Sequence, residues 1–482
     1  MIAPLVILVA WCLALAQAQA ADLMAVYGRA LQNDPQLRES EANRLAALEA
    51  KPQAVAALLP QLSANGTVTH ERDSGSSNTV ELVNGELNGA AINSVESFPF
   101  GGRTLTNSSH YGFDLRQNLF RWENWVALRR ADARVAQAEA DYQAAQQDLM
   151  IRVAQRYFDV LGAEDDLDAQ QEALSSVSRQ LAQAERRYAV GLVAVTDVQE
   201  ARASHDSGVA AVIAAKRQLA TSREMLREII GDPFDALARP TEPFDLPDPD
   251  PMGEDQWVEM ALQQNLLLVS SRMAADIARE NISAARGGHS PSLDLVASGY
   301  RTTSNGEQVY PGGGLEGGSS VDQIQRTIGL QVTVPIYSGG LVSSEVRQAV
   351  YLHRAAKERL ERVARETERE ARDAYLGVLS EISRVRALKR ALESNTTGLK
   401  ATETGYEAGT RTAVDVLESR RQWTQAQTNY RRSRYDYLVN MLKLQLAAGT
   451  LSEQSLRRVN GWLRDAADAP AASEAPAAPA AP

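Results

Sequence analysis

The pattern of apolar residues predicts long helices over much of the chain. Between positions 135 and 160 the apolar positions recur at steps of three and four, which is the spacing of a coiled-coil seam. These positions are Val135, Ala138, Tyr142, Ala145, Leu149, Val153, Tyr157 and Val160. The seam lies inside a stretch without proline, 121–232, and a second such stretch covers 336–469. Because proline interrupts helices, both stretches are expected to be helical.

Four shorter segments alternate apolar and polar residues and are predicted to be strands. They are 62–72, 110–120, 292–302 and 327–336. Each has about ten residues, the length that a tilted strand needs to cross a bilayer. The polar, glycine-rich segments between them, 73–94 and 305–322, are expected to be exposed loops.

Two interpretations of these strands are open. They could pack as a soluble sandwich, or they could span a membrane. Four strands cannot close a transmembrane barrel alone, since single-chain barrels start at about eight strands. If the strands span a membrane, several copies of the chain must therefore share one barrel.

An internal repeat organises the chain. The stretch "YAVGLVAVTDVQEAR" at 188–202 returns 218 residues later as "YEAGTRTAVDVLESR" at 406–420. At the same offset, Tyr157 falls on Tyr375 and Gly231 falls on Gly449. Each half has a helix, two strands and a long helical stretch, in that order; in the first half this helix is expected between Asn33-Asp34-Pro35 and Pro60. We therefore expect two fused, similar repeats, 21–240 and 256–464, joined by a proline-rich linker at 241–255.

Two repeated glycines are predicted to be hairpin turns. Gly191 and Gly409 lie in the middle of the two helical stretches. A turn there would fold each stretch into a long helical hairpin. Gly231 and Gly449 are expected at the helix ends, where glycine is common.

The two ends of the chain have distinct compositions. Residues 1–20 are mostly apolar and finish on Ala-Gln-Ala, which predicts a cleaved signal peptide and therefore export. The only cysteine, Cys12, lies within this leader, so the mature chain would have neither a disulfide nor a thiolate metal site. No run of 18 apolar residues follows the leader, so no membrane-spanning helix is expected. Residues 465–482 are rich in alanine and proline and are expected to be disordered.

Charge and motifs argue against several function classes. The net charge of −11 disfavours a nucleic-acid partner. The five histidines have no ligand spacing, and no hydrolase elbow or phosphate loop is present. We expect no catalytic residues, no metal site and no cofactor.

Two acidic pairs have a structural interpretation. Asp197 and Glu200, like Asp415 and Glu418, have the spacing of a helix N-cap followed by a glutamate three residues later. Capping would explain why both pairs recur in the repeat. It does not explain Arg411, which stands where the first copy has Val193.

Several motifs together resemble a known family. "LLPQL", "GLVAVTDVQEAR", "PSLDLVAS", "VPIYSGG", "GTRTAVDVL" and "AAGTL" occur in the order found in TolC-like outer-membrane factors, also called outer-membrane efflux proteins. The resemblance covers roughly residues 21–464. It implies a mainly α fold with a small transmembrane β part. A homotrimer would form a shared 12-stranded β-barrel in outer-membrane lipid and a long α-helical coiled-coil barrel in the periplasm.

The resemblance also implies a function. Members of the family are exit ducts of tripartite efflux pumps and type I secretion systems, which conduct drugs or proteins passively. The expected partners are a periplasmic adaptor (membrane fusion) protein and an inner-membrane transporter. Two other classes stay open: a periplasmic coiled-coil adaptor or scaffold without channel activity, and an exported enzyme on a helical frame.

Site residues follow from the same resemblance. It assigns a gate in which Tyr406 and Arg411 of the second hairpin hold Thr196 and Asp197 of the first. A further gate residue, glutamine in a close relative, falls on Arg186. The acidic ring of the entrance, a cation-binding site, falls on Asp415 and Glu418; the latter is usually aspartate in the close relative.

Overall fold

The computed structural model describes residues 21–87, 90–234, 236–240, 246–309 and 317–464. The predicted signal peptide, part of the linker and the alanine- and proline-rich tail lie outside these residues. The chain forms two compact units. The helical unit takes its residues from Met1–Ala47, Arg134–Ala275 and Ala355–Pro482, and the sheet unit from Leu48–Ala133 and Asp276–Arg354. Each unit draws on both halves of the repeat, so the division at 240 and 256 stays a prediction about the sequence.

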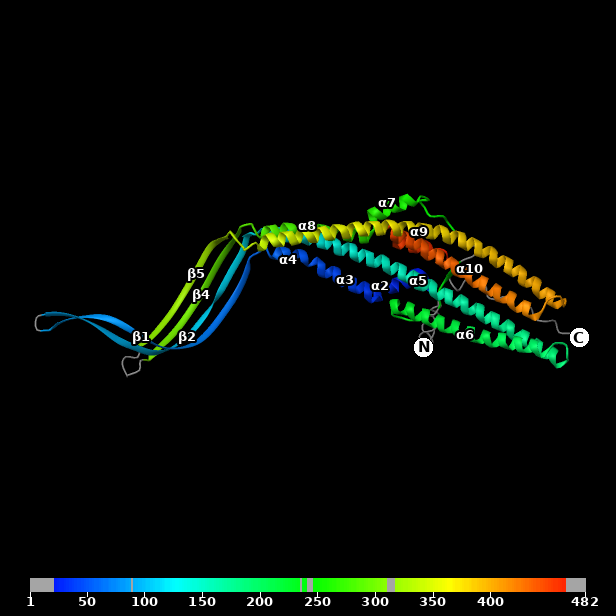
Figure 1. The fold of residues 1–482 in the computed structure, drawn as a ribbon, viewed down its shortest axis with the longest axis horizontal. Coiled ribbons are helices and arrows are strands. Elements are labelled where there is room, and N and C mark those ends of the chain that lie inside the picture. The colour runs from blue at the N-terminus through cyan, green and yellow to red at the C-terminus, as the bar shows by residue number, and fades with distance from the viewer. Residues whose placement is uncertain (1–20, 88–89, 235, 241–245, 310–316, 465–482) are drawn as a thin grey trace, which may run out of the picture. The chain divides into compact units, whose positions relative to one another are not determined.

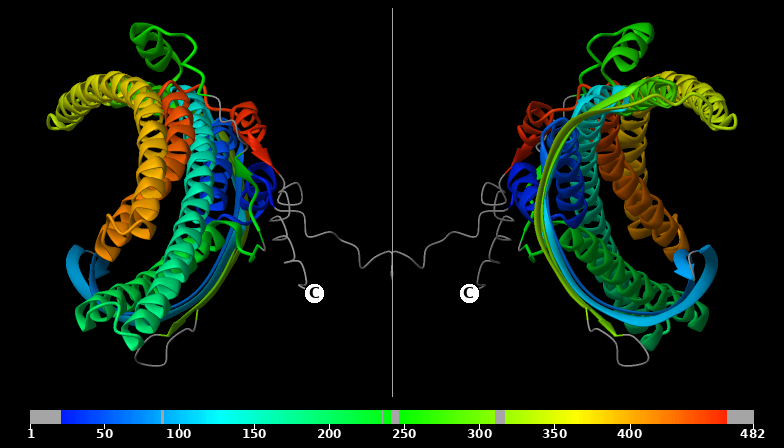
Figure 2. Two further views of the ribbon diagram at one scale, coloured as in Figure 1. Left: turned by 90° about the vertical axis from the view of Figure 1, so that its right-hand side faces the viewer. Right: turned by 90° about the vertical axis from the view of Figure 1, so that its left-hand side faces the viewer.

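Four long helices form the main layer of the helical unit. They are α5 (Trp122–Ala189), α6 (Val195–Ile230), α9 (Leu341–Glu407) and α10 (Ala413–Ala447). They lie side by side in the order α9, α10, α5, α6 (Figures 1 and 2). The two predicted helical hairpins are therefore confirmed: α5 returns as α6, and α9 returns as α10. The predicted helix ends are confirmed too, with Gly231 at a φ of 81° and Gly449 at 74°.

Shorter helices complete the chain. They are α2 (Leu23–Asn33), α3 (Pro35–Leu48), α4 (Ala50–Ala56), α7 (Glu254–Gln264), α8 (Leu266–Gly287) and α11 (Glu453–Asn460). The sequence predicted α3 and α4 as one helix between Asn-Asp-Pro and Pro60, but it missed α2. The Asp22 side chain accepts a hydrogen bond from the backbone N–H of Ala25 and caps this helix.

The predicted seam is the core of the helical unit over its second half. Leu149, Val153, Tyr157 and Val160 are fully buried. The first half of the seam, from Val135 to Ala145, is only partly buried. Small and aliphatic residues at steps of three and four let α5 pack closely on its neighbours.

The repeated tyrosines fix the connection between the two halves. The Tyr157 hydroxyl donates to the carbonyl of Ala238 at 2.7 Å, next to the short strand β3 (Arg239–Pro240). Its repeat partner Tyr375 donates to the carbonyl of Met252. Strand β3 pairs with β6 (Leu463–Arg464). A layer that includes the Ala238 backbone and β3 thus covers the face of α5 on which Tyr157 lies.

The sheet unit contains one antiparallel sheet of four strands. Its strands are β1 (Gln61–Leu87), β2 (Ala90–Phe120), β4 (Ser292–Val309) and β5 (Gly317–Thr333). Their order is β1-β2-β4-β5, so each half of the repeat gives one hairpin and the two hairpins meet through β2 and β4 (Figure 1). In register, Arg103 stands opposite Val309 and Ser292 opposite Thr333. Strands β1 and β5 are the edges.

The strands correct two predictions. Segments 73–94 and 305–322 are not mainly loops, because β1, β2, β4 and β5 continue through most of them. Threonine and valine in these segments favour extended backbone. Strand β5 ends at Thr333 rather than at 336, since Pro335 has no N–H for the ladder.

One face of the edge strand β5 is mainly apolar and open, although Arg326 lies on it between Ile324 and Ile328. Ile324, Ile328, Leu330 and Val332 alternate with polar or small residues, and each is more than half exposed. On β1, Val68 is 86% exposed. A soluble sandwich would bury such residues against a second sheet, so this sheet lacks a covering layer within the described residues.

Candidate gate and channel entrance

The two hairpin turns have nearly the same geometry. Gly191 and Gly409 both have a φ of 77°, and a Cβ atom at either would meet nothing within 4 Å. The left-handed backbone, and not a lack of space, therefore explains the glycine. This confirms both predicted turns.

Tyr406, a predicted gate residue, joins the two hairpins. Nη1 of Arg187 on α5 donates to the Tyr406 hydroxyl on α9 at 3.2 Å. The same guanidinium lies 5.5 Å from the centroid of the Tyr406 ring, a cation–π contact. Among the described residues, the bond from Arg187 is the one hydrogen bond of the Tyr406 side chain.

The sequence pointed to Arg186 rather than to Arg187. In the structure Nε of Arg186 donates to the carbonyl of Ala182 in its own helix. Consecutive helical residues point about 100° apart, so only one member of the Arg186-Arg187 pair can face α9. The pair was visible in the sequence, but its orientation was not.

The other predicted gate residues are not brought together in one chain. Thr196 is exposed and Asp197 is half-buried in the first turn of α6. Within the described residues, the side chains of Thr196, Asp197 and Arg411 form no hydrogen bond or ion pair with one another. Their predicted contact with the second hairpin therefore needs another copy of the chain or another state of this one, and it stays a prediction.

The start of α10 corrects the capping interpretation. The N-cap is Thr412, and Asp415 is the third residue of the capping box. Oδ2 of Asp415 accepts from the backbone N–H and the hydroxyl of Thr412 at 2.9 and 3.0 Å. These bonds lower the pKa of Asp415. The predicted N-cap position for Asp415 was wrong by three residues.

The first hairpin has no such box. The N-cap of α6 is Ala194, which makes no side-chain cap bond, and Asp197 lies in the first turn. The prediction that Asp197 is an N-cap was therefore also wrong. Without a hydroxyl at position 194, the aspartate has no cap partner.

Glu418 is engaged by its own helix. Its Oε1 accepts from Nη2 of Arg421 at 2.7 Å and from the Gln422 amide at 2.9 Å, and its Oε2 accepts from Nε of Arg421 at 2.9 Å. The hydrogen bonds from Arg421, with that from Gln422, lower the pKa of Glu418 to about 2. The carboxylate therefore stays ionised over the physiological range.

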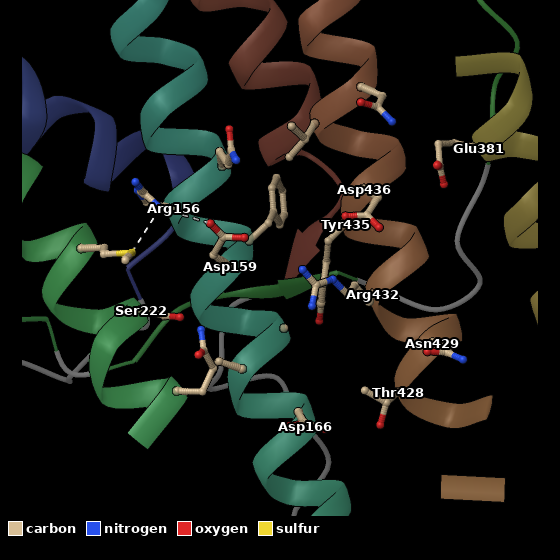
Figure 3. Close-up of a pocket in the computed structure, with 18 of the residues that line it drawn as sticks. Arg156, Asp159, Asp166, Ser222, Glu381, Thr428, Asn429, Arg432, Tyr435 and Asp436 are labelled. Carbon is tan, nitrogen blue, oxygen red and sulfur yellow. Dashed lines mark hydrogen bonds and ion pairs between the residues drawn. The ribbon is translucent and has the colours of Figure 1, made fainter. Parts of the chain in front are cut away.

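A cavity of about 680 Å³ lies along the four-helix layer. Figure 3 shows Arg156 and Asp159 of α5 on one wall and Arg432, Tyr435 and Asp436 of α10 on the other. Asp159 is two residues, or about 200° of helix, from Tyr157. The cavity thus lies on the face opposite to the layer that contains β3.

A second cavity of about 670 Å³ lies between α6 and α10, nearer the hairpin turns. It is lined by Glu200 and Glu418, by alanine, serine and glycine residues of α6, and by Gln170, Ala173 and Val177 of α5. Gln425 and Thr428 line both cavities, so the two form a continuous groove along α10.

Two further properties concern other kinds of site. No helix in the described part of the chain is long and apolar enough to cross a membrane. Among the same residues, no group of three or more histidine, cysteine, aspartate or glutamate side chains could hold a metal ion.

Known proteins are similar to this chain over most of its length. The chain is 35% identical over 455 residues to the outer membrane protein TolC of Vibrio cholerae, covering 92% of this chain and 94% of that protein. It is 36% identical over 451 residues to TolC of Escherichia coli, covering 92% and 85%. It is 29% identical over 464 residues to the proteases secretion protein PrtF of Dickeya chrysanthemi, covering 93% and 92%.

Solved structures share the fold at lower identity. The CmeC outer membrane channel of Campylobacter jejuni matches with a TM-score of 0.69 at 19% identity, covering 91% of this chain and 88% of that chain. The outer membrane protein VceC of Vibrio cholerae matches with a TM-score of 0.67 at 18% identity, covering 89% and 96%. The family model described as outer membrane efflux protein matches residues 26–232 and 257–450. With both halves matched and two nearly full-length relatives at 35% and 36% identity, the chain belongs to the outer membrane efflux protein family.

Proposed function

We propose that three copies of this chain build one outer-membrane exit duct. Family membership makes the chain an outer-membrane channel protein for efflux and secretion, and the proposal concerns how it is assembled and gated. The observation that carries it is the four-stranded sheet with open edges β1 and β5 and an exposed apolar face. In lipid every backbone N–H and C=O must be paired, so these edges have to meet other copies. Three copies with four strands each supply a 12-stranded barrel.

The helical unit supplies the periplasmic part of the duct. Its two hairpins, α5–α6 and α9–α10, come from the two repeats, 21–240 and 256–464. Each copy therefore adds two hairpins to a helical tunnel. A periplasmic adaptor and an inner-membrane transporter would dock at the tunnel entrance, and the cargo would be small toxic compounds or secreted proteins. PrtF, the relative with a protein-secretion name, supports the second kind of cargo.

The gate combines a bond within one chain with bonds between chains. Arg187 and Tyr406 join the hairpins of one copy. Arg411 has no ion pair in the described protomer, which leaves it available for Thr196 and Asp197 of a neighbouring copy. Charge-assisted bonds of ~1.5–3 kcal/mol each are strong enough to hold a resting gate and weak enough for a docking adaptor to break.

The entrance carries an acidic ring. In the trimer, Asp415 and Glu418 from three copies surround one opening near the turns of the second hairpins. Crowded carboxylates in a narrow opening attract cations and bind multivalent ones. The low pKa values of both groups keep this ring ionised.

A planar-bilayer recording of the purified protein, with a mass measurement in detergent, tests the assembly. We expect a trimer and discrete conductance steps. A periplasmic adaptor or scaffold, the alternative that the helices leave open, would give no steps and does not need four paired strands. A monomer in detergent that never conducts would overturn the proposal.

A further inference from the structure

The two carboxylates of the proposed acidic ring have different surroundings. Both oxygens of Glu418 face the guanidinium of Arg421, three residues further along α10, in a two-point pair at 2.7 and 2.9 Å. Such a paired geometry places a full positive charge directly against the carboxylate. At the distance of a few ångströms the pair acts on a passing ion as a dipole, whose field falls off faster than that of a single charge.

Asp415 has no such counter-charge in contact. Its Oδ2 accepts two hydrogen bonds, both from neutral groups of Thr412. Within the described residues, Oδ1 of Asp415 has no hydrogen bond and the carboxylate has no ion pair. Asp415 therefore has no cation in contact at the start of α10; the hydrogen bonds from Thr412 and, after them, the more distant charge of Arg411 lower its pKa.

Two neighbouring arginines contact other groups and do not pair with the carboxylates of the proposed ring. Arg420 is directed to Glu403 on α9 and ties the second hairpin together. Arg187 is directed to Tyr406. Of the arginines in the described hairpin ends, Arg421 is the one in contact with a carboxylate of the ring, and its side chain is 76% exposed.

We propose that Arg421 is a specificity-determining residue of the entrance, because it cancels the charge of Glu418 and leaves Asp415 to attract cations. This inference rests on the acidic ring of the proposed function. Asp415, Glu418 and Arg421 together carry a net charge of −1 in each copy. In a trimer these three groups sum to −3, where the carboxylates alone would give −6.

The expected effect depends on salt. A unit charge roughly 10 Å from the channel axis changes the local concentration of a monovalent cation about two-fold in unscreened water. Screening over a Debye length of about 10 Å at 0.1 M salt reduces the combined effect of three arginines to about two-fold. At 0.01 M salt, with a Debye length of about 30 Å, it grows to about four-fold.

The test is the reversal potential of single channels in planar bilayers under a KCl gradient. Arg421→Gln should raise the ratio of K⁺ to Cl⁻ permeability about two-fold near 0.1 M salt and about four-fold near 0.01 M. It should also strengthen block by a trivalent cation such as hexamminecobalt(III). Glu418→Gln combined with Arg421→Gln should return the permeability ratio to that of the wild type, since one charge of each sign is then removed.

The control is Arg457→Gln on α11. Arg457 forms an exposed ion pair with Glu453 in its own helix at 2.6 Å, so this variant loses a similar pair away from the entrance. Its permeability ratio should equal that of the wild type. An unchanged ratio in Arg421→Gln at both salt concentrations would overturn the inference, while conductance steps in the same recordings would leave the proposed channel intact. A wild-type protein that gives no steps would instead reject the proposed function.

Discussion

Arg187 and Tyr406 are 219 residues apart in the sequence, yet the guanidinium of one donates to the hydroxyl of the other at 3.2 Å and lies over its ring. This contact joins the outgoing helix of the first hairpin to that of the second, about one turn before each glycine turn. A gate that moves one hairpin against the other would have to break it.

Arg187→Gln should therefore loosen the resting gate. The variant loses the cation–π contact and weakens the hydrogen bond, together about 1–2 kcal/mol. We expect larger single-channel conductance and greater sensitivity of cells to bulky antibiotics that the outer membrane normally excludes. Arg186→Gln is the matched control, since among the described residues the Arg186 side chain bonds to the carbonyl of Ala182 in its own helix and not to α9. Equal effects of the two variants would assign the result to lost charge rather than to the Tyr406 contact.

The second prediction concerns the bonds between chains. Tyr406→Phe together with Arg411→Ser removes the hydroxyl and the guanidinium proposed to hold Thr196 and Asp197. If each charge-assisted bond contributes ~1.5–3 kcal/mol, the double variant should open readily without an adaptor. Single-channel conductance and antibiotic leakage measure this. Val193→Ser, at the position that matches Arg411 in the first repeat, should have little effect, and a wild-type conductance in the double variant would reject the latch.

The sequence predicted those parts of the fold that depend on local rules. A proline-free seam predicted α5, and Gly191 and Gly409 predicted the turns, because left-handed backbone there requires glycine. The predicted strands were too short, since β1 and β2 continue through a polar, glycine-rich segment whose composition is typical of loops. Pairing with a neighbouring strand, and not the composition of the segment, decides where such a strand ends.

The site shows the same limits. Thr412-x-x-Asp415 has capping-box spacing, so Thr412 could have been predicted as the N-cap from the sequence. Aspartate is itself a common N-cap residue, and for this reason Asp415 was predicted as the cap instead. Arg187 could not be chosen over Arg186 without knowing which face of α5 meets α9. Arg421 follows Glu418 at helical spacing, but pairing at i,i+3 is common on any solvated helix.

The capping and channel roles of the second hairpin can be separated. Thr412→Ala removes the cap but keeps the Asp415 charge, and it should cost about 1 kcal/mol of stability with unchanged ion selectivity. Asp415→Asn removes the charge, and it should lower the preference for cations. Chemical denaturation and reversal potentials measure the two effects on the same proteins. If Thr412→Ala alters selectivity as much as Asp415→Asn does, the carboxylate acts through the helix start and not through its charge.

The last prediction concerns Asp159, which lines the cavity of the four-helix layer (Figure 3). Burial raises its pKa, and the nearby carboxylate of Asp436 adds to this, while Arg156, Arg432 and Lys443 oppose the rise without cancelling it. A carboxyl group whose pKa is higher in the folded than in the unfolded chain binds its proton more tightly when folded. Ionised Asp159 therefore destabilises the fold at neutral pH. That destabilisation disappears as the pH falls through the folded pKa toward the unfolded value near 3.9.

Asp159→Asn should accordingly raise the thermal midpoint at pH 7.5 and leave it unchanged near pH 3.5, where the native carboxyl is protonated as well. Asp206→Asn, on the exposed surface of α6, controls for the loss of one negative charge from the whole protein. Arg432→Gln provides a second test, because it removes a cation that favours ionised Asp159. As the pH is lowered, the stability of this variant should therefore begin to rise at a higher pH than that of the wild type. A stabilisation by Asp159→Asn that is the same at both pH values would mean that the side chain acts through packing, and the titration argument would fail.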